Sequence, residues 1–398
     1  MPAPRAVPAR GVAEAATAAV GAAGGRDLRL DFFRGLSLFF IFIDHIPENV
    51  LSYFTLHSIA FCDAAEVFIF ISGYTAALVY GQSFKRSGAL LATAQIYRRV
   101  WQLYVAHVFL FVIFTAEVSY TLIAAQSPMY TEELGVGDFL KEPHIAVMHA
   151  LLLDFQPPLL DILPLYIVLL GTFPLVLVGL EKAPGLPALV SAMLYGLTLR
   201  RGWALHTYPD NQAWFFNPLA WQFLFVIGAS CAYARAGRDR RLLPRWLSGA
   251  AAAAAAGILF ISLTWMAHWM YDPFPPLFLK LWYLTLDKTN LAPMRLFSFL
   301  ALAGATLHFV QPDSRFLRWD AARPVILCGQ NSLYIFCLGI VLSVLGHFVL
   351  SDVNSGAAMQ IAVNAVGIAV MVGTAALMQW FKMASRRPSA RPAAAEEP

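Results

Sequence analysis

Apolar residues recur along the whole chain in long blocks, and charged residues collect in the short segments between them. A helix of about 20 residues spans the hydrocarbon core of a bilayer, and blocks this uniformly apolar do not suit the alternating strands of a barrel. The pattern therefore predicts an all-α integral membrane protein, a polytopic bundle of about ten transmembrane helices. The predicted spans are 28–46, 63–81, 100–124, 159–180, 186–200, 217–236, 248–270, 291–311, 324–350 and 356–381.

Composition indicates the same class of protein. Hydrophobic residues make up 59% of the 398 residues and charged residues 13%, whereas charged residues make up about 25% of a soluble domain. The net charge of +4 is too small to indicate nucleic-acid binding, and the four cysteines form no CxxC pair, so we expect no metal site. Residues 1–27 and 383–398 are rich in alanine, proline and charged residues, which predicts disordered tails flanking one membrane domain, 28–382.

Basic residues are unevenly distributed between the two sides of the predicted bundle. With the N-terminus in the cytoplasm, 21 of the 28 Lys and Arg residues fall in cytoplasmic segments and five fall on the opposite side. Cytoplasmic loops of membrane proteins carry such an excess. We therefore expect an even number of spans, with the N-terminus and the C-terminus both cytoplasmic.

The first span carries Asp31, Arg34, Asp44 and His45, and ionisable residues inside a membrane are costly enough to point to function. Arg34 and His45 are eleven residues apart, so on a helix they share a face, about 16 Å apart along the axis. We expect His45 to act as a general base, because imidazole accepts a proton near neutral pH. Asp31 lies three residues before Arg34, close enough for a structural ion pair. Asp44 points about 100° away from His45, toward another helix or a loop.

The second span begins with Asp63 and Glu66, which share a helix face at the level of His45. Acidic side chains favour a helix N-terminus, and for Asp63 we adopt this structural interpretation. Glu66 lies one turn deeper, where its carboxylate could orient the His45 imidazole and stabilise the protonated form, so we include Glu66 and Asp44 among the catalytic candidates. His347, at the outer end of the ninth span, is a second candidate base.

Two groups of residues are candidates for binding an anionic ligand. Arg98 and Arg99 precede the third span, where they either anchor the helix at the cytoplasmic surface or bind phosphate. Asn331 and Ser332 begin the polar part of the ninth span, where amides and hydroxyls either cap a helix or bind a ligand.

Five segments of the chain resemble the bacterial OpgC family, which is named for the succinylation of osmoregulated periplasmic glucans. They are LDFFRGLSLFFIFIDHI, DAAEVFIFISGYTAALVYG, LDILPLYIVLL, NPLAWQFLFVIGA and CGQNSLYIFCLGIVLSVLGHF. The resemblance covers roughly 28–350. This family is similar to the wider membrane acyltransferase type-three group, which has an arginine in the first helix followed by ten residues and a histidine. Arg34 and His45 match that spacing, and Arg98 and Arg99 match a basic pair at the third helix.

The resemblance implies a multi-pass O-acyltransferase of the bacterial inner membrane. It would transfer an acyl group from cytoplasmic acyl-CoA, succinyl-CoA or acetyl-CoA, to a hydroxyl of a periplasmic glucan or another envelope glycan. Acyl-CoA is then a co-substrate, no cofactor is bound, and the lipid bilayer is the other partner. In the wider group the histidine is the proposed base and the arginine helps to hold the acyl donor.

The polar residues are also compatible with other functions. In a transporter or flippase for an envelope glycan or lipid, the stripe on the first span would be a proton relay, although we find no internal repeat typical of many transporters. In a non-catalytic scaffold, neither Arg34 nor His45 would be needed for function. If the donor is succinyl-CoA, its additional carboxylate requires a cation, for which Arg295 and Lys280 are candidates.

Overall fold

The computed structural model describes residues 27–125, 137–209, 212–235, 243–266 and 286–385. This part of the chain is helical and contains no named strand, as the apolar blocks predict. The helices are α2 (Leu28–Asp44), α3 (Leu56–Ile59), α4 (Ala64–Ala125), α6 (Gly137–Lys141), α7 (Pro143–Leu151), α8 (Ile162–Lys182), α9 (Leu186–Arg201), α10 (Pro218–Arg235), α11 (Arg245–Met266), α13 (Pro293–Phe309), α14 (Ala322–Gln330), α15 (Ser332–Phe348) and α16 (Ala357–Ala384). Short helical turns cover Val50–Phe54, Arg315–Arg318 and Val349–Val353.

Within the described residues, five helices are long and apolar enough to cross a membrane. They are Ala64–Tyr120, Ile162–Lys182, Arg245–Thr264, Ser332–Val353 and Ala357–Ala384. The protein is therefore a helical membrane protein, whereas ten crossings and the sidedness of the termini stay predictions. The predicted tails fall almost entirely in 1–26 and 386–398, outside the described residues.

The region between the second and third predicted spans is helical rather than an open loop. Helix α4 runs through both spans and is interrupted at Gly88, where φ is 81° and ψ is 171°. Glycine adopts positive φ readily because it has no Cβ, so the chain turns there and continues as a second helix. The two halves, 64–87 and 89–125, face one another, since Ser72 of the first half and Leu103 of the second line the same cavity.

The ninth predicted span is divided into two helices. Helix α14 ends at Gln330 and α15 begins at Ser332, with Asn331 in a non-helical conformation between them. Asn331 is buried, and its side-chain amide donates to the carbonyl oxygen of Leu327 at 3.0 Å. The single uninterrupted span 324–350 is therefore wrong, because the polar residues at its start satisfy the backbone at a helix break.

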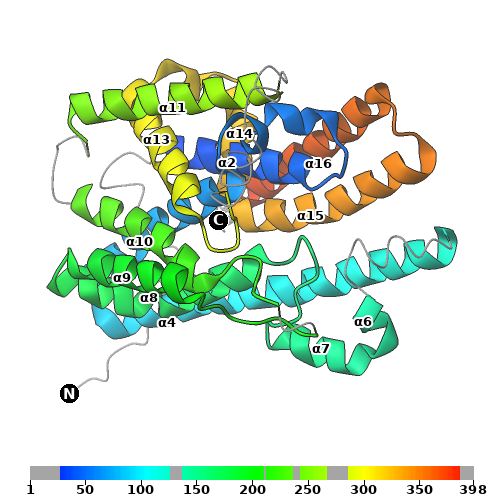
Figure 1. The fold of residues 1–398 in the computed structure, drawn as a ribbon, viewed down its shortest axis with the longest axis horizontal. Helices are drawn as coiled ribbons and strands as arrows, with labels where there is room; N and C mark the ends of the chain where they lie inside the picture. Colours follow the sequence, from blue (N-terminus) through cyan, green and yellow to red (C-terminus); the bar gives the residue numbers. More distant parts are fainter. Residues whose placement is uncertain (1–26, 126–136, 210–211, 236–242, 267–285, 386–398) are drawn as a thin grey trace, which may run out of the picture.

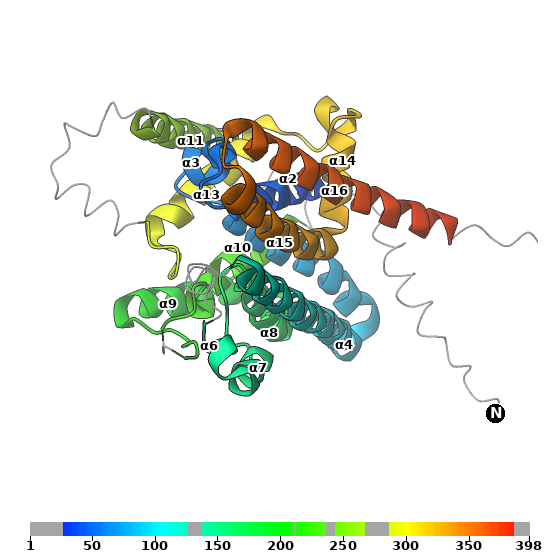
Figure 2. The ribbon, with the colours of Figure 1, turned by 90° about the vertical axis from the view of Figure 1, so that its right-hand side faces the viewer.

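Figures 1 and 2 show the helices in two layers, with α4 and α8–α10 in one and α2, α11 and α13–α16 in the other. Helix α2 crosses α14 at very close range, since a Cβ on Gly35 would clash with the carbonyl oxygen of Val325. Glycine permits this approach, as small residues do at many helix crossings in membranes. The crossing fixes the rotation of α2 and therefore the direction of Arg34, the residue directly before Gly35.

The N-terminal end of α2 and the C-terminal end of α16 meet at one end of the bundle. Gln330 donates to Asp31 at 3.4 Å, and the ammonium of Lys382 donates to the side-chain oxygen of the adjacent Asn331 at 2.7 Å. The two described ends of the chain therefore lie at the same end of the molecule, which is compatible with an even number of crossings.

Candidate active site

Two cavities lie along the bundle, one beside each end of the polar stripe on α2. The arginine cavity, lined by Arg34 and Arg99, has a volume of about 190 Å³. The histidine cavity, lined by His45 and Asp44, has a volume of about 500 Å³. The side chain of Phe336 on α15 lines both, so the two cavities adjoin at this ring.

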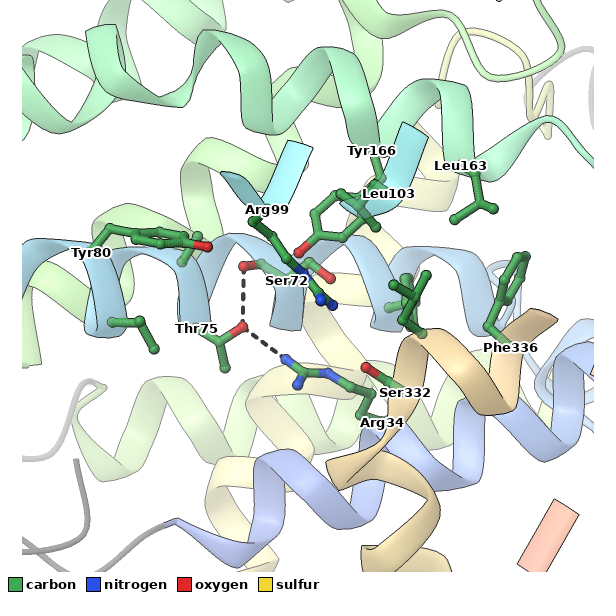
Figure 3. A pocket seen from close by; sticks show the side chains of 14 residues that line it. Arg34, Ser72, Thr75, Tyr80, Arg99, Leu103, Leu163, Tyr166, Ser332 and Phe336 are labelled. Carbon is green, nitrogen blue, oxygen red and sulfur yellow. Dashed lines mark hydrogen bonds between the residues drawn. The ribbon is translucent and has the colours of Figure 1, made fainter. Parts of the chain in front are cut away.

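Arg34 and Arg99 reach into the arginine cavity from different helices. Nη2 of Arg34 donates to the hydroxyl of Thr75 at 2.8 Å and to the carbonyl oxygen of Ile71 at 3.3 Å, both in the first half of α4. Figure 3 shows Arg99 extending from the second half of α4 toward Arg34, with Ser72 beside them. Two positive charges that face one cavity are stabilised by an anion between them, so the arrangement favours an anionic ligand.

The remaining polar groups of the arginine cavity are hydroxyls, and none of the described residues that line it is acidic. The hydroxyls belong to Ser72, Thr75, Tyr80, Tyr166 and Ser332. A hydroxyl can donate to a phosphate or carbonyl oxygen without adding charge. The cavity therefore combines positive charge with neutral hydrogen-bond donors. This combination suits a ligand that carries both phosphate and carbonyl oxygens.

The structure separates the two adjacent arginines of the third span. Arg99 is half-buried, lines the arginine cavity and donates to the side-chain oxygen of Gln102 at 3.1 Å. Arg98 is exposed and is not among the residues that line either cavity. Of the two predicted phosphate ligands, only Arg99 lies where it can contact a molecule in the cavity.

Ser332 and Asn331 likewise have different positions. Ser332 lines the arginine cavity, as expected for a ligand-binding residue. The amide of Asn331 is engaged by Leu327 and Lys382, at the break between α14 and α15. Asn331 therefore holds the start of α15 in place and is not among the residues that line the arginine cavity.

The ring of His45 is oriented by its own helix. Its Nδ1 makes a hydrogen bond with the carbonyl oxygen of Ile41, one turn earlier. A carbonyl oxygen only accepts, so Nδ1 carries a proton, and in the neutral ring Nε2 then carries the lone pair. A neutral imidazole in this tautomer at the wall of a cavity has the arrangement that a general base requires.

Acidic side chains are concentrated in the histidine cavity, where Asp44, Glu48, Asp63 and Asp161 contribute to the lining. Asp44 accepts a hydrogen bond of 2.6 Å from the hydroxyl of Thr55 and so turns toward the loop after α2. Carboxyl groups form hydrogen bonds with hydroxyl groups, which suits a ligand rich in hydroxyls. The two adjoining cavities therefore have different linings, one with arginines and hydroxyls and the other with acidic side chains.

Glu66 caps helix α4 and forms an ion pair, which corrects its expected role beside His45. Its Oε2 accepts the backbone N–H of Asp63 at 2.9 Å, while Oδ1 of Asp63 accepts the N–H of Ala65 at 2.8 Å. This reciprocal pattern is a capping box. Oε1 of Glu66 accepts from Nε of Arg295 at 2.8 Å. The carboxylate is thus fully engaged, and the Ile41 carbonyl orients the imidazole in its place.

Arg295 is also committed to the protein itself. Its Nη2 lies 2.7 Å from Oε1 of Glu66 and 3.0 Å from Oδ2 of Asp63, and the residue is buried. A buried guanidinium with two carboxylate partners is not available to a ligand carboxylate without breaking those pairs. Arg295 is therefore a structural cation, and the other candidate, Lys280, lies outside the described residues.

Lys288 is the cation of this cluster that reaches the histidine cavity. Its ammonium lies 2.7 Å from Oδ2 of Asp63 and 5.2 Å from the ring centroid of Phe216, and Lys288 and Phe216 both line the cavity. Partial burial by itself would lower the pKa of Lys288, but the carboxylates of Asp63 and Glu66 raise it above the usual value. Lys288 therefore stays charged and holds the Phe216 loop against the start of α4.

His347 is buried near the end of α15 and is not among the residues that line either cavity. It is therefore a poorer candidate base than His45. Asp31 lies at the far end of α2 and accepts from Gln330. The predicted ion pair between Asp31 and Arg34 stays a prediction.

A family model described as OpgC protein matches residues 26–383. The chain belongs to the OpgC family. Comparisons with curated proteins and with solved structures gave no match. Membership of the OpgC family indicates a membrane acyltransferase-like function in glucan modification. All the residues that line the two cavities lie within the matched part of the chain.

Several residues that line the cavities of this OpgC-family chain were not singled out by sequence reasoning. They are Thr75, Tyr166, Asp161, Lys288 and Phe336. Only Asp161 leaves a local signal, because an acidic residue directly before an apolar span marks a helix start. The other four residues lie in helical or loop segments without a recognisable motif. Only the residues that pack against them from distant segments show that they line a cavity.

Proposed function

We propose that this OpgC-family protein is a membrane O-acyltransferase that transfers an acyl group, succinyl in particular, from cytoplasmic acyl-CoA to a hydroxyl of a periplasmic glucan. The arrangement of the two cavities is the observation that carries the proposal. A cationic cavity at Arg34 and Arg99 adjoins an acid-rich cavity that contains the Nε2 lone pair of His45. A thioester donor and a hydroxyl acceptor need these two environments next to one another.

Each residue then has a defined task in the transfer. Arg34 and Arg99 bind anionic or carbonyl oxygens of the donor. Nε2 of His45 removes the proton from the acceptor hydroxyl, and the resulting alkoxide attacks the thioester carbonyl carbon. The C–O bond of the new ester forms as the C–S bond breaks. The thiolate of CoA leaves and recovers a proton, so the products are the acylated glucan and free CoA.

The decisive experiment is His45→Gln in the purified full-length protein, with acyl-CoA and glucan as substrates. Loss of a general base lowers the turnover rate by a factor of about 10²–10⁴, while binding of acyl-CoA is retained because the arginine cavity is unchanged. His57→Gln is the matched control, since His57 lines the same cavity and has no assigned role in proton transfer. We expect it to keep most of the activity.

Full turnover in His45→Gln would exclude His45 as the base. Glycan movement across vesicles without release of CoA would instead support a transporter with a proton relay. A wild-type protein that neither binds acyl-CoA nor moves glycan would support the scaffold interpretation. The assay therefore distinguishes all three functions compatible with the sequence.

A further inference from the structure

The junction between the two cavities is formed by an aromatic side chain to which no role has been assigned. Phe336 lines the arginine cavity together with Ser332, one turn earlier on α15, and it lines the histidine cavity together with His45. It is the residue common to the two linings. Figure 3 shows it at the end of the arginine cavity away from Tyr80.

Packing from three helices holds the Phe336 ring at this junction. The ring centroids of Phe336 and Phe68 of α4 are 6.2 Å apart, and those of Phe68 and Tyr166 of α8 are 6.3 Å apart. Phe336 is 3% exposed and Phe68 is 6% exposed. Both rings are thus enclosed by protein, with free space on the two cavity sides of Phe336.

In this position the Phe336 ring would separate the two reactants. The proposed transfer therefore requires the ring to take part in the reaction. The thioester carbon in the arginine cavity and the hydroxyl at His45 must come within bonding distance, and Phe336 lies between the two cavities. A permanently open junction would also admit water. His45 would then activate water, whose attack on the thioester carbon gives the free acid and CoA in place of the ester.

We propose that Phe336 is the residue that determines which acyl groups reach His45. Its ring turns aside to admit a short acyl group from the arginine cavity, and it excludes longer acyl groups and water. The inference rests on the proposed acyltransferase function and adds to it a size limit on the donor. Phe68 supports the ring from α4 and sets how far it can turn.

The test compares Phe336→Ala and Phe336→Leu with the wild-type protein, using acetyl-, succinyl-, butyryl- and octanoyl-CoA as donors. Removing the ring is expected to raise the relative rate with octanoyl-CoA by about tenfold or more, the range by which pocket volume discriminates between substrates. CoA release without glucan is expected to rise several-fold, because water now reaches the thioester. The leucine variant changes both properties in the same direction and less.

Tyr334→Ala is the matched control, because Tyr334 lies two residues earlier on α15 with 61% of its surface exposed. It should leave donor selectivity and CoA release unchanged. The affinity for acyl-CoA should stay the same in every variant, because Arg34 and Arg99 are untouched. Thermal unfolding in detergent identifies any variant that fails to fold, and the leucine variant then carries the test.

The two proposals fail in different ways. A wild-type protein that transfers no acyl group from any donor would remove the acyltransferase function, and the role of Phe336 with it. Wild-type transfer combined with unchanged chain-length selectivity and unchanged hydrolysis in both folded Phe336 variants would overturn the role of Phe336 alone.

Discussion

The two cavities adjoin at one phenylalanine and yet have opposite chemistry. The arginine cavity presents two guanidinium groups and five hydroxyls, whereas the histidine cavity presents four carboxylates, Lys288 and two histidines. The two linings thus differ in the sign of the charge that they carry most of. In the proposed reaction this difference would keep the acyl donor and the acceptor in separate cavities until the reacting atoms meet.

The two cavities also differ in the kind of structure that builds them. The arginine cavity is lined from within helices α2, α4, α8 and α15, whereas much of the histidine cavity is lined from helix ends and loops, including residues 46–53 and 215–216. Side chains within packed helices have well-defined positions, while loops vary in length and sequence more readily. We therefore expect the arginine cavity to be the more rigid of the two.

The largest effect is expected from Arg295→Gln, which tests whether the acceptor side depends on its buried charges. The substitution leaves Glu66 without its buried cation, and removal of one partner of a buried pair costs about 3–5 kcal/mol of folding stability. The free energy of unfolding in a denaturing detergent is the measurement. The double variant Glu66→Gln with Arg295→Met should recover part of the loss, because no unpaired buried charge remains. Equal stability of Arg295→Gln and wild type would remove the structural role of the cluster.

The next largest effect is expected from Arg34→Gln. This substitution should weaken the binding of acyl-CoA and leave the binding of glucan unchanged. Loss of a hydrogen-bonding charge costs about 1.5–3 kcal/mol, so we expect the KM for acyl-CoA to rise by a factor of about 10–100. The KM for glucan should change little, because Arg34 does not line the histidine cavity. Equal increases in both KM values would contradict the division of the site into two functionally distinct cavities.

A smaller effect is expected from substitutions of the two adjacent arginines, and it should appear at Arg99 but not at Arg98. Arg99→Gln should raise the KM for acyl-CoA by a factor of about 5–10, as expected for one partly exposed charged contact. Arg98→Gln is its matched control and should behave as wild type, because Arg98 is exposed and outside the cavity. If the two variants behave alike, Arg99 acts through general surface charge and not through contact with the donor.

The smallest effect is expected from Lys288→Met on the acceptor side. Its ion pair with Asp63 is partly exposed, so the loss of stability is about 1 kcal/mol. The pKa of Lys288 is raised in the folded protein, so this contribution is fully present below the usual lysine pKa of about 10.4 and is lost as the pH rises through the folded value. Unfolding measured between pH 6 and pH 11 should therefore show a constant difference from wild type up to about pH 10. A difference that already disappears near pH 8 would assign the effect to another group.

The sequence predicted the helical fold well and the site only in part. Arg34 and His45 line the cavities at the two ends of α2, where the helical repeat places them. Glu66, Arg295 and Asn331 line neither cavity, and each makes a side-chain contact with another element of the fold. The sequence predicted one continuous helix over 324–350 and not the break at Asn331. A short polar interruption between two apolar segments does not change the overall apolar pattern.

The amino-acid pattern alone specifies the apolar helices and the spacing of Arg34 and His45 along one of them. Both follow from local regularities, namely the length that spans a bilayer and the 3.6-residue repeat. The packing of the helices is what pairs Glu66 with Arg295, 229 residues away, and brings Arg99 and not Arg98 into a cavity. It also places Phe336 in the lining of both cavities. These features depend on how helices distant in the sequence cross, and no local pattern records that.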